Sequence, residues 1–174
     1  FESIAAGEAE LLSGQSLQAG AVRIAASGLA LQGCLLRVLA RYRREFPHVR
    51  ICLTNHSTPQ GLAAVQNGLA DLAVVSEGSI VPDSLVKQKV AEVQEVPVCG
   101  AGFSQLAGKA LSLAELADHP IICLTSGTSS HTFYADLFRR YDLPFCPDIE
   151  VETVDQVLPV VRSDLGIGFV PREM

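Results

Sequence analysis

The sequence of 174 residues has no apolar run that approaches the ~20 residues of a membrane-spanning helix. It begins with Phe1 and shows no basic and then apolar leader, so we expect no signal peptide in this stretch, although a longer precursor could carry one. The location that we expect is cytoplasmic, in keeping with the reduced thiols described below.

Clusters of basic residues are absent as well. The chain carries 13 Lys and Arg against 19 Asp and Glu, a formal net charge of −6, and its Arg residues are scattered. Contacts to phosphates need clustered Lys and Arg side chains. We therefore expect that this stretch does not bind nucleic acid by itself.

The cysteines form no C-x-x-C pair and no Cys/His cluster at the spacing of metal ligands. All except one lie within or beside apolar runs, where cysteine packs as a small core residue. We expect reduced structural thiols and no metal site, with redox sensing or nucleophilic chemistry as the less favoured alternative. The five are Cys34, Cys52, Cys99, Cys123 and Cys146, of which Cys146 is the exception.

Motifs of catalysis and of cofactor binding are also missing. The sequence has no G-x-S-x-G elbow, no Walker-type glycine-rich loop and no dinucleotide fingerprint after a strand. No Cys/His pair can be placed together from the sequence. We expect no catalytic residues and no cofactor, and a protein that is not an enzyme.

What the chain does contain is a sizeable core, because nearly half of its residues are apolar and fewer than a fifth are charged. Residues 21–51 organise it as a short strand, a small-residue turn at 25–28, a long helix from about 29 to 46, and a second strand after Pro47. The opposite side of that helix carries Arg37, Arg41 and Arg44. We expect this side to be solvated, with an interface as the alternative. The apolar residues at helical spacing are Leu31, Leu35, Val38 or Leu39, Tyr42 and Phe46.

The first half continues with a strand at 49–54 and a helix that Thr58 can cap, with Pro59 at its first position. Asn67 and Gly68 end this helix, and the apolar run 72–75 is typical of a strand buried on both faces of a parallel sheet.

The second half repeats the alternation of strands and helices. We expect extended segments at 85–90 and 93–99, a capping box at 112–115, strands at 121–124, 149–154 and 165–171, and helices after 130 and at 155–163. Pro159 fits the first turn of the last helix only if Asp155 caps it. The helix after 130 has Phe133, Leu137, Phe138 and Tyr141 at its apolar positions.

This order predicts an α/β fold of two Rossmann-like lobes joined by extended hinge segments. In such sheets ligands bind beyond the carboxyl ends of the strands, at helix N-termini.

The order of the motifs resembles the effector-binding, or regulatory, domain of LysR-type transcriptional regulators. The motifs are G-A-V-R-I-A-A-S, A-R-Y-R-R-E-F-P-H-V, N-G-L-A-D-L-A-V-V, L-S-L-A-E-L-A-D-H-P-I-I and L-G-I-G-F-V-P. The resemblance implies a fold like type II periplasmic binding proteins, with residues 1–18 as a linker-helix remnant, 19–96 as lobe I and 97–174 as lobe II.

The sequence departs from that pattern in two places. Asp164 stands where family members usually have Gly, which leaves the turn conformation there open. Family members also continue beyond the Val170–Pro171 pair with a segment that returns to the first lobe. Either lobe I lacks part of its packing, or this segment exists outside the given stretch.

We expect a small effector, a carboxylate, at the three helix starts near 28, 58 and 129. Ser27 and Thr58 can contact it, cap their helices, or do both, and the competing interpretation of 125–128 is a flexible, solvated loop. His56 and His131 can add positive charge or be ordinary surface residues, and Leu29 and Leu62 can form an apolar wall. The predicted ligand-binding residues are Ser27, Gly28, Leu29, Ser57, Thr58, Thr125, Ser126, Gly127 and Thr128.

The function that follows is effector sensing and oligomerisation in a LysR-type transcriptional regulator. The resemblance implies a homodimer, with a tetramer as the alternative at full length, and DNA binding only through a winged helix-turn-helix domain outside this stretch. One alternative is a free-standing solute-binding protein of the same fold, and another is a small α/β transferase that uses the same crevice.

Overall fold

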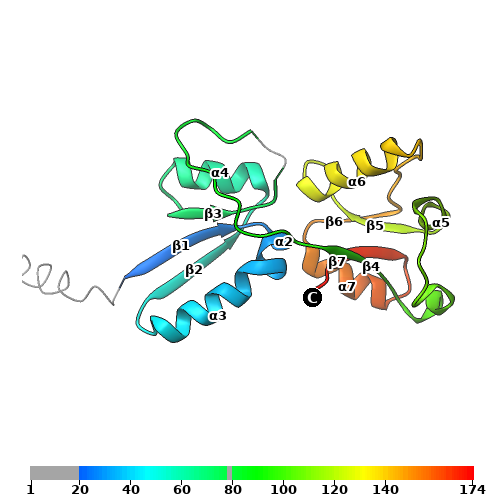
Figure 1. Ribbon diagram of the computed structural model, residues 1–174, viewed down its shortest axis with the longest axis horizontal. Helices are drawn as coiled ribbons and strands as arrows, with labels where there is room; N and C mark the ends of the chain where they lie inside the picture. Colours follow the sequence, from blue (N-terminus) through cyan, green and yellow to red (C-terminus); the bar gives the residue numbers. More distant parts are fainter. Residues whose placement is uncertain (1–19, 78–79) are drawn as a thin grey trace, which may run out of the picture.

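The computed structural model describes residues 20–77 and 80–174, which form two lobes side by side (Figure 1). Each lobe has its own sheet with helices on both faces. The expected linker-helix remnant at 1–18 lies outside the described residues. Within the described chain, no helix is both long and apolar enough to cross a membrane.

Lobe I is built on a parallel sheet of three strands in the order β2-β1-β3. Connections from β1 to β2 and from β2 to β3 run in opposite directions, which places their helices on opposite faces of the sheet (Figure 1). The elements of lobe I are β1 (Ala21–Ala26), α2 (Gly28–Ala30), η1 (Leu31–Leu35), α3 (Leu36–Glu45), β2 (Arg50–Asn55), α4 (Thr58–Gln66) and β3 (Leu72–Val74).

The helix after β1 is not the continuous α-helix that the apolar spacing predicted. Its second turn, η1, is π-helical and separates α2 from α3. Buried Gly33 lies in this turn against Val93, whose Cγ1 atom would be 2.5 Å from a Cβ atom at position 33. The Gly33 carbonyl accepts a hydrogen bond from Arg37 at 3.2 Å. Spacings of three and four residues do not reveal such an inserted residue.

The face that α3 turns to the core is also narrower than expected. Leu39 packs on the lobe I core and Leu35 of the preceding turn is buried. Val38 is 60% exposed and Phe46 42%, so neither is a core residue. The three arginines of the predicted solvated side are all exposed.

The cap of α4 is Ser57, one residue earlier than predicted. The Ser57 N–H donates to Gln60 Oε1 at 3.0 Å, the signature of a capping box. Thr58 is therefore the first helical residue and Pro59 the second. The helix ends where predicted, with Asn67 as C-cap and Gly68 at a φ of 69°.

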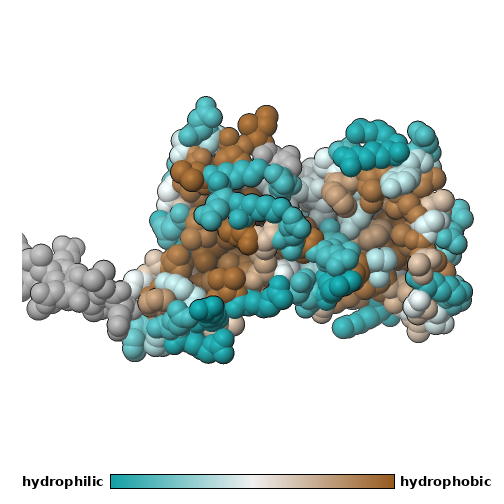
Figure 2. All heavy atoms as spheres, viewed as in Figure 1, coloured by the Kyte–Doolittle hydropathy of each residue, from teal (hydrophilic) through white to brown (hydrophobic). Residues whose placement is uncertain are grey.

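β3 is an edge strand, so the expectation of a strand buried on both faces is wrong. Leu72 is 40% exposed, and Figure 2 shows apolar surface over the strands of lobe I. Asp71 ties the strand to β1, because its carboxylate accepts from the Arg23 N–H at 2.8 Å and from the Arg23 guanidinium at 2.6 Å. The aspartate of the N-G-L-A-D-L-A motif is thus structural.

Lobe II has a mixed sheet of four strands in the order β4-β7-β5-β6, with β4 antiparallel to β7. The connection from lobe I, residues 80–94, contains no strand, so the segment expected to be extended at 85–90 pairs with neither sheet. The elements of lobe II are β4 (Glu95–Cys99), η2 (Ala101–Leu106), α5 (Leu113–Ala117), β5 (Ile121–Leu124), α6 (Ser129–Arg140), β6 (Ile149–Val151), α7 (Val154–Arg162) and β7 (Ile167–Pro171). The predicted capping box opens α5.

The buried face of α6 differs from the prediction. Phe138 is buried as expected, but Phe133 is 57% and Tyr141 66% exposed. The core side is instead formed by Ser130, Tyr134 and Phe138, at a spacing of four residues. Tyr134 stacks on Phe169 with ring centroids 4.2 Å apart, which explains its inward position.

The last helix begins earlier than predicted, at Val154, with Thr153 as its N-cap. Pro159 consequently lies in the middle of α7, on the exposed side opposite its buried valines. Asp164 then adopts a φ of 57°, the left-handed conformation that glycine favours. Its carboxylate accepts a hydrogen bond from the Gly102 N–H at 2.7 Å, which stabilises this turn without glycine.

Candidate functional site

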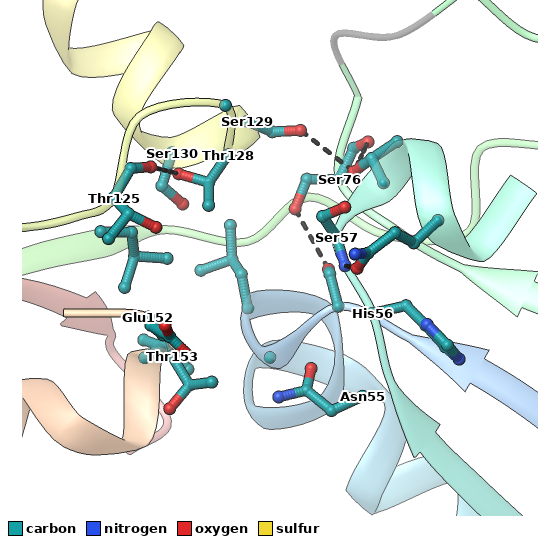
Figure 3. A pocket seen from close by; sticks show the side chains of 18 of the residues that line it. Asn55, His56, Ser57, Ser76, Thr125, Thr128, Ser129, Ser130, Glu152 and Thr153 are labelled. Carbon is teal, nitrogen blue, oxygen red and sulfur yellow. Dashed lines mark hydrogen bonds between the residues drawn. The ribbon is translucent and has the colours of Figure 1, made fainter.

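A cavity of about 470 Å³ lies between the lobes, where the strands of both sheets end at their carboxyl sides. Each contributing strand delivers a polar residue directly or within two positions: β1 leads to Ser27, β3 to Ser76, β5 to Thr125 and β6 to Glu152. Figure 3 shows Ser76 on one wall and Thr125 and Glu152 on the facing wall. This is where α/β sheets bind ligands.

Four helix caps border this cavity. Ser27 Oγ accepts from the Ala30 N–H at 3.3 Å, and Thr128 Oγ1 accepts from the His131 N–H at 3.2 Å. Ser57 and Thr153 open α4 and α7 through capping boxes. The positive ends of helix dipoles therefore border the cavity from both lobes.

All nine residues predicted to bind a ligand line this one cavity. Sequence reasoning missed the start of α7, because it extended the preceding strand to 154 and so overlooked Glu152 and Thr153. The same signal that located the other helix starts, a hydroxyl residue after a strand, was present at Thr153. The further lining residues are Asn55, His56, Gln60, Ser76, Leu124, Ser129, Ser130, Glu152, Thr153 and Val154.

Three residues considered from the sequence do not fit their suggested roles. Leu62 does not line the cavity, so it forms no apolar wall there. His131 packs edge-on against Phe145 instead, with ring centroids 5.4 Å apart. His56 borders the cavity, but its imidazole is directed away from lobe II in Figure 3.

A hydroxyl network crosses the cavity from lobe I to lobe II. Thr58 Oγ1 donates to the Ser76 carbonyl at 3.2 Å and lies 3.0 Å from Ser129 Oγ, which belongs to α6. Ser76 Oγ lies 3.4 Å from Ser27 Oγ. Because Thr58 is N1 rather than the cap, its hydroxyl is free to make these contacts.

The described residues that line the cavity include no Lys or Arg, and Glu152 is their one acidic side chain. Elsewhere in the described chain no three His, Cys, Asp or Glu side chains are grouped as metal ligands would be. The cavity therefore offers hydrogen bonds and helix ends rather than cationic side chains.

Three titratable groups whose pKa values are raised by burial lie inside lobe II and do not line the cavity. Burial raises the pKa of the Glu95 carboxyl, an effect that a hydrogen bond from Tyr134 partly offsets. Burial also raises the pKa of Tyr134, and it raises the pKa of Cys123 to about 12. Cys123 is thus an inert core thiol.

The two α/β lobes enclose a polar cleft that is bordered by helix starts from both sides. The chain matches the LysR substrate binding domain family over residues 15–174. It belongs to this family.

The curated relatives are regulators of transcription. A probable nitrogen assimilation transcriptional activator of Synechococcus elongatus is 26% identical over 147 residues, which is 82% of this chain and 47% of the relative. The uncharacterized HTH-type transcriptional regulator YeiE of Escherichia coli K12 is 27% identical over 155 residues, 89% of this chain and 52% of the relative. The chain spans about half the length of the curated relatives it matches.

Solved structures share the fold. Full-length CbnR in complex with its target DNA superposes with a TM-score of 0.76 at 16% identity, over 97% of this chain and 58% of CbnR. The effector binding domain of QuiR in complex with shikimate superposes with a TM-score of 0.73 at 15% identity, over 88% of this chain and 74% of the QuiR domain. The effector binding domain of BenM with its effector benzoate superposes with a TM-score of 0.64 at 23% identity, over 88% of this chain and 71% of the BenM domain.

Proposed function

We propose that this chain is the effector-sensing domain of a LysR-type transcriptional regulator and that it binds a small carboxylate between its lobes. The observation that carries this proposal is the convergence of four helix starts on one cavity whose described lining contains no Lys or Arg. Two structural neighbours support it, because the effector binding domains of BenM and QuiR were solved with the carboxylates benzoate and shikimate.

The anion would be held by neutral groups. The starts of α4 and α6 border the cleft, and each exposed helix end contributes about 0.3–1 kcal/mol toward an anion. The hydroxyl of Thr125 adds a donor from lobe II, whereas the Thr128 hydroxyl already donates to the Thr125 carbonyl at 2.9 Å. Without Lys or Arg, such a site suits one or two carboxylates better than a polyphosphate.

A ligand that touches both walls stabilises one relative placement of the lobes, so binding shifts a population of conformers. In a full regulator this shift would reposition DNA-binding domains that lie outside this stretch, in the cytoplasm. We further propose that residues 1–18 are the end of a linker helix. The rest of the chain would form the two regulatory lobes that the sequence predicts. The expected lobe boundary at 96/97 cuts β4, and the sheet pairing favours a boundary just before Glu95.

Self-association is part of the proposal. The outer face of α3 and the edge strand β2 carry exposed apolar side chains on lobe I, and α6 does so on lobe II. A two-fold operation can pair α3 and β2 of one copy with α6 of another. The residues concerned are Leu36, Val38, Phe46, Leu53, Phe133 and Tyr141.

The test is calorimetry against a panel of small mono- and dicarboxylates, with the matching amides as uncharged controls. We expect at least one acid to bind with 1:1 stoichiometry and its amide not to bind. Ser27→Ala and Thr58→Val should weaken binding by about 1–3 kcal/mol if a ligand oxygen loses its partner. The control Ser104→Ala removes an exposed hydroxyl outside the cavity and should change nothing. Equal binding by all variants would place the site elsewhere.

Two other functions make different predictions. A free-standing solute-binding protein of the same fold would bind the ligand too, but its gene would encode a leader peptide in place of a helix-turn-helix. A transferase would turn the bound ligand over, which product analysis after long incubation detects.

A further inference from the structure

The cavity has one charged feature that a simple anion does not explain. Glu152 is exposed at the cavity wall, and its carboxylate has no salt bridge or hydrogen-bond partner among the described residues. Among the residues that the structure describes, no Lys or Arg lines the cavity to neutralise it. A ligand with only negative charge would leave this carboxylate unpaired and be repelled by it.

The Glu152 carboxylate is not needed to cap α7. The capping box is completed by Gln156 Oε1, which accepts from the backbone N–H groups of Glu152 and Thr153 at 2.9 and 3.1 Å. A carboxylate beside this helix start does favour the helix dipole, but that role requires no particular direction of the side chain. Glu152 therefore stays available to a ligand.

The position of Glu152 makes the two ends of the cavity electrostatically different. Figure 3 draws Glu152 beside Thr153 on the wall of lobe II, well separated in the view from Ser129 at the other end. The Ser129 end has the starts of α4 and α6 and the hydroxyl network, which provide donors for an anion. The Glu152 end provides an acceptor with a full negative charge.

We propose that the effector is a zwitterion of the amino-acid type, which places its carboxylate at the starts of α4 and α6 and its ammonium group against Glu152. This inference rests on the proposed function and narrows its ligand class. An ammonium group has three donors and a positive charge, so it both satisfies the carboxylate oxygens and removes the repulsion.

The experiment uses sets of three probes with a common side chain: an L-amino acid, the 2-hydroxy acid and the primary amine that lacks the carboxylate. Calorimetry on the whole chain should show an amino acid that binds about tenfold or more tightly than its hydroxy acid and its amine. Glu152→Gln should remove that preference, since it weakens the amino acid about tenfold and leaves the hydroxy acid unchanged or tighter.

Glu150→Gln is the matched control, because Glu150 is exposed two positions earlier and does not line the cavity. Thermal unfolding of each variant verifies that the fold is intact. Binding of hydroxy acids as tight as that of amino acids, with no effect of Glu152→Gln, would overturn the zwitterion and leave the proposed carboxylate site standing. If no carboxylate of any kind binds, the proposed function itself fails.

Discussion

Thr58 and Ser129 join the two lobes directly, with their hydroxyl oxygens 3.0 Å apart. Thr58 is 4% exposed, and its own hydrogen is directed to the Ser76 carbonyl, so Ser129 must be the donor to Thr58. A ligand that takes the Thr58 hydroxyl as a partner has to exchange this bond. The same residue is therefore both part of the predicted binding wall and a fastening between the lobes.

The first prediction concerns this contact. Thr58→Val keeps the shape of the side chain and removes its hydroxyl, and Ser129→Ala removes the partner. In a double-mutant cycle, the free energies of unfolding should show a coupling of about 0.5–1.5 kcal/mol between the two positions. Additive effects, with no coupling beyond error, would mean that the bond does not contribute in solution.

The second prediction concerns the contact between the π-helical turn and the connection between the lobes. Gly33→Ala puts a methyl group 2.5 Å from Val93 Cγ1 and should lower the free energy of unfolding by about 1–3 kcal/mol. Urea titration measures it. The double variant Gly33→Ala/Val93→Ala relieves the overlap, so it should be at least as stable as Val93→Ala alone. Gly20→Ala, with no atom within 4 Å of the added methyl group, is the neutral control.

The third prediction is a dependence on pH. Because burial raises the pKa of Glu95 in the folded protein, the folded state binds its proton more tightly than the unfolded state does. The stabilisation is present below the ordinary carboxyl value of 4.5 and is lost as the pH rises through the higher, folded value.

Glu95→Gln should therefore flatten the fall in stability above pH 4.5 and raise stability at neutral pH relative to the parent. Chemical unfolding at a series of pH values gives both curves. Glu150→Gln, at an exposed carboxyl of the same sheet, should follow the parent curve. An identical pH profile for Glu95→Gln and the parent would contradict the raised pKa.

The fourth prediction concerns the proposed dimer. Val38 on α3 is 60% exposed, and Val38→Asp should convert dimer to monomer at tens of micromolar in sedimentation velocity. Val86→Asp is the matched control, since Val86 is fully exposed on the connection between the lobes, away from α3, β2 and α6. A parent chain that already sediments as a monomer would count against self-association of this stretch.

The fifth prediction concerns DNA. With a net charge of −6 and scattered arginines, the isolated chain should show no sequence-specific complex with a duplex near physiological ionic strength. Fluorescence anisotropy with labelled duplexes measures this. A salt-sensitive complex with one defined sequence would contradict it.

The sequence was most informative where local chemistry decides the structure. The capping box at Ser112, the end of α4 at Gly68 and the buried strand β5 were all predicted correctly. The nine residues that line one cavity could be anticipated because each follows a strand or opens a helix.

The failures occurred where partners distant in sequence decide. The π-helical turn is associated with the contact between Gly33 and Val93, sixty residues apart, and Tyr134 is inside because it stacks on Phe169. Val38 and Phe46 continue the apolar spacing of α3 yet remain exposed, since no described element covers them. Spacing along one helix identifies an amphipathic face but not the width that its neighbours cover.

The two lobes differ in how their cores are packed, and this difference predicts how readily each lobe opens locally. The six largest fully buried side chains, Phe138, Ile122, Ile167, Val154, Val157 and Pro171, all belong to lobe II. Lobe I closes its sheet mainly with small residues such as Ala25 and Ala26, and its edge strand β3 is short and half-open. Local opening costs least where few apolar contacts must break, so amide hydrogens in lobe I should exchange with solvent ahead of those in lobe II. A ligand that spans the cleft would then slow exchange chiefly in lobe I, with lobe II as the rigid half against which it closes.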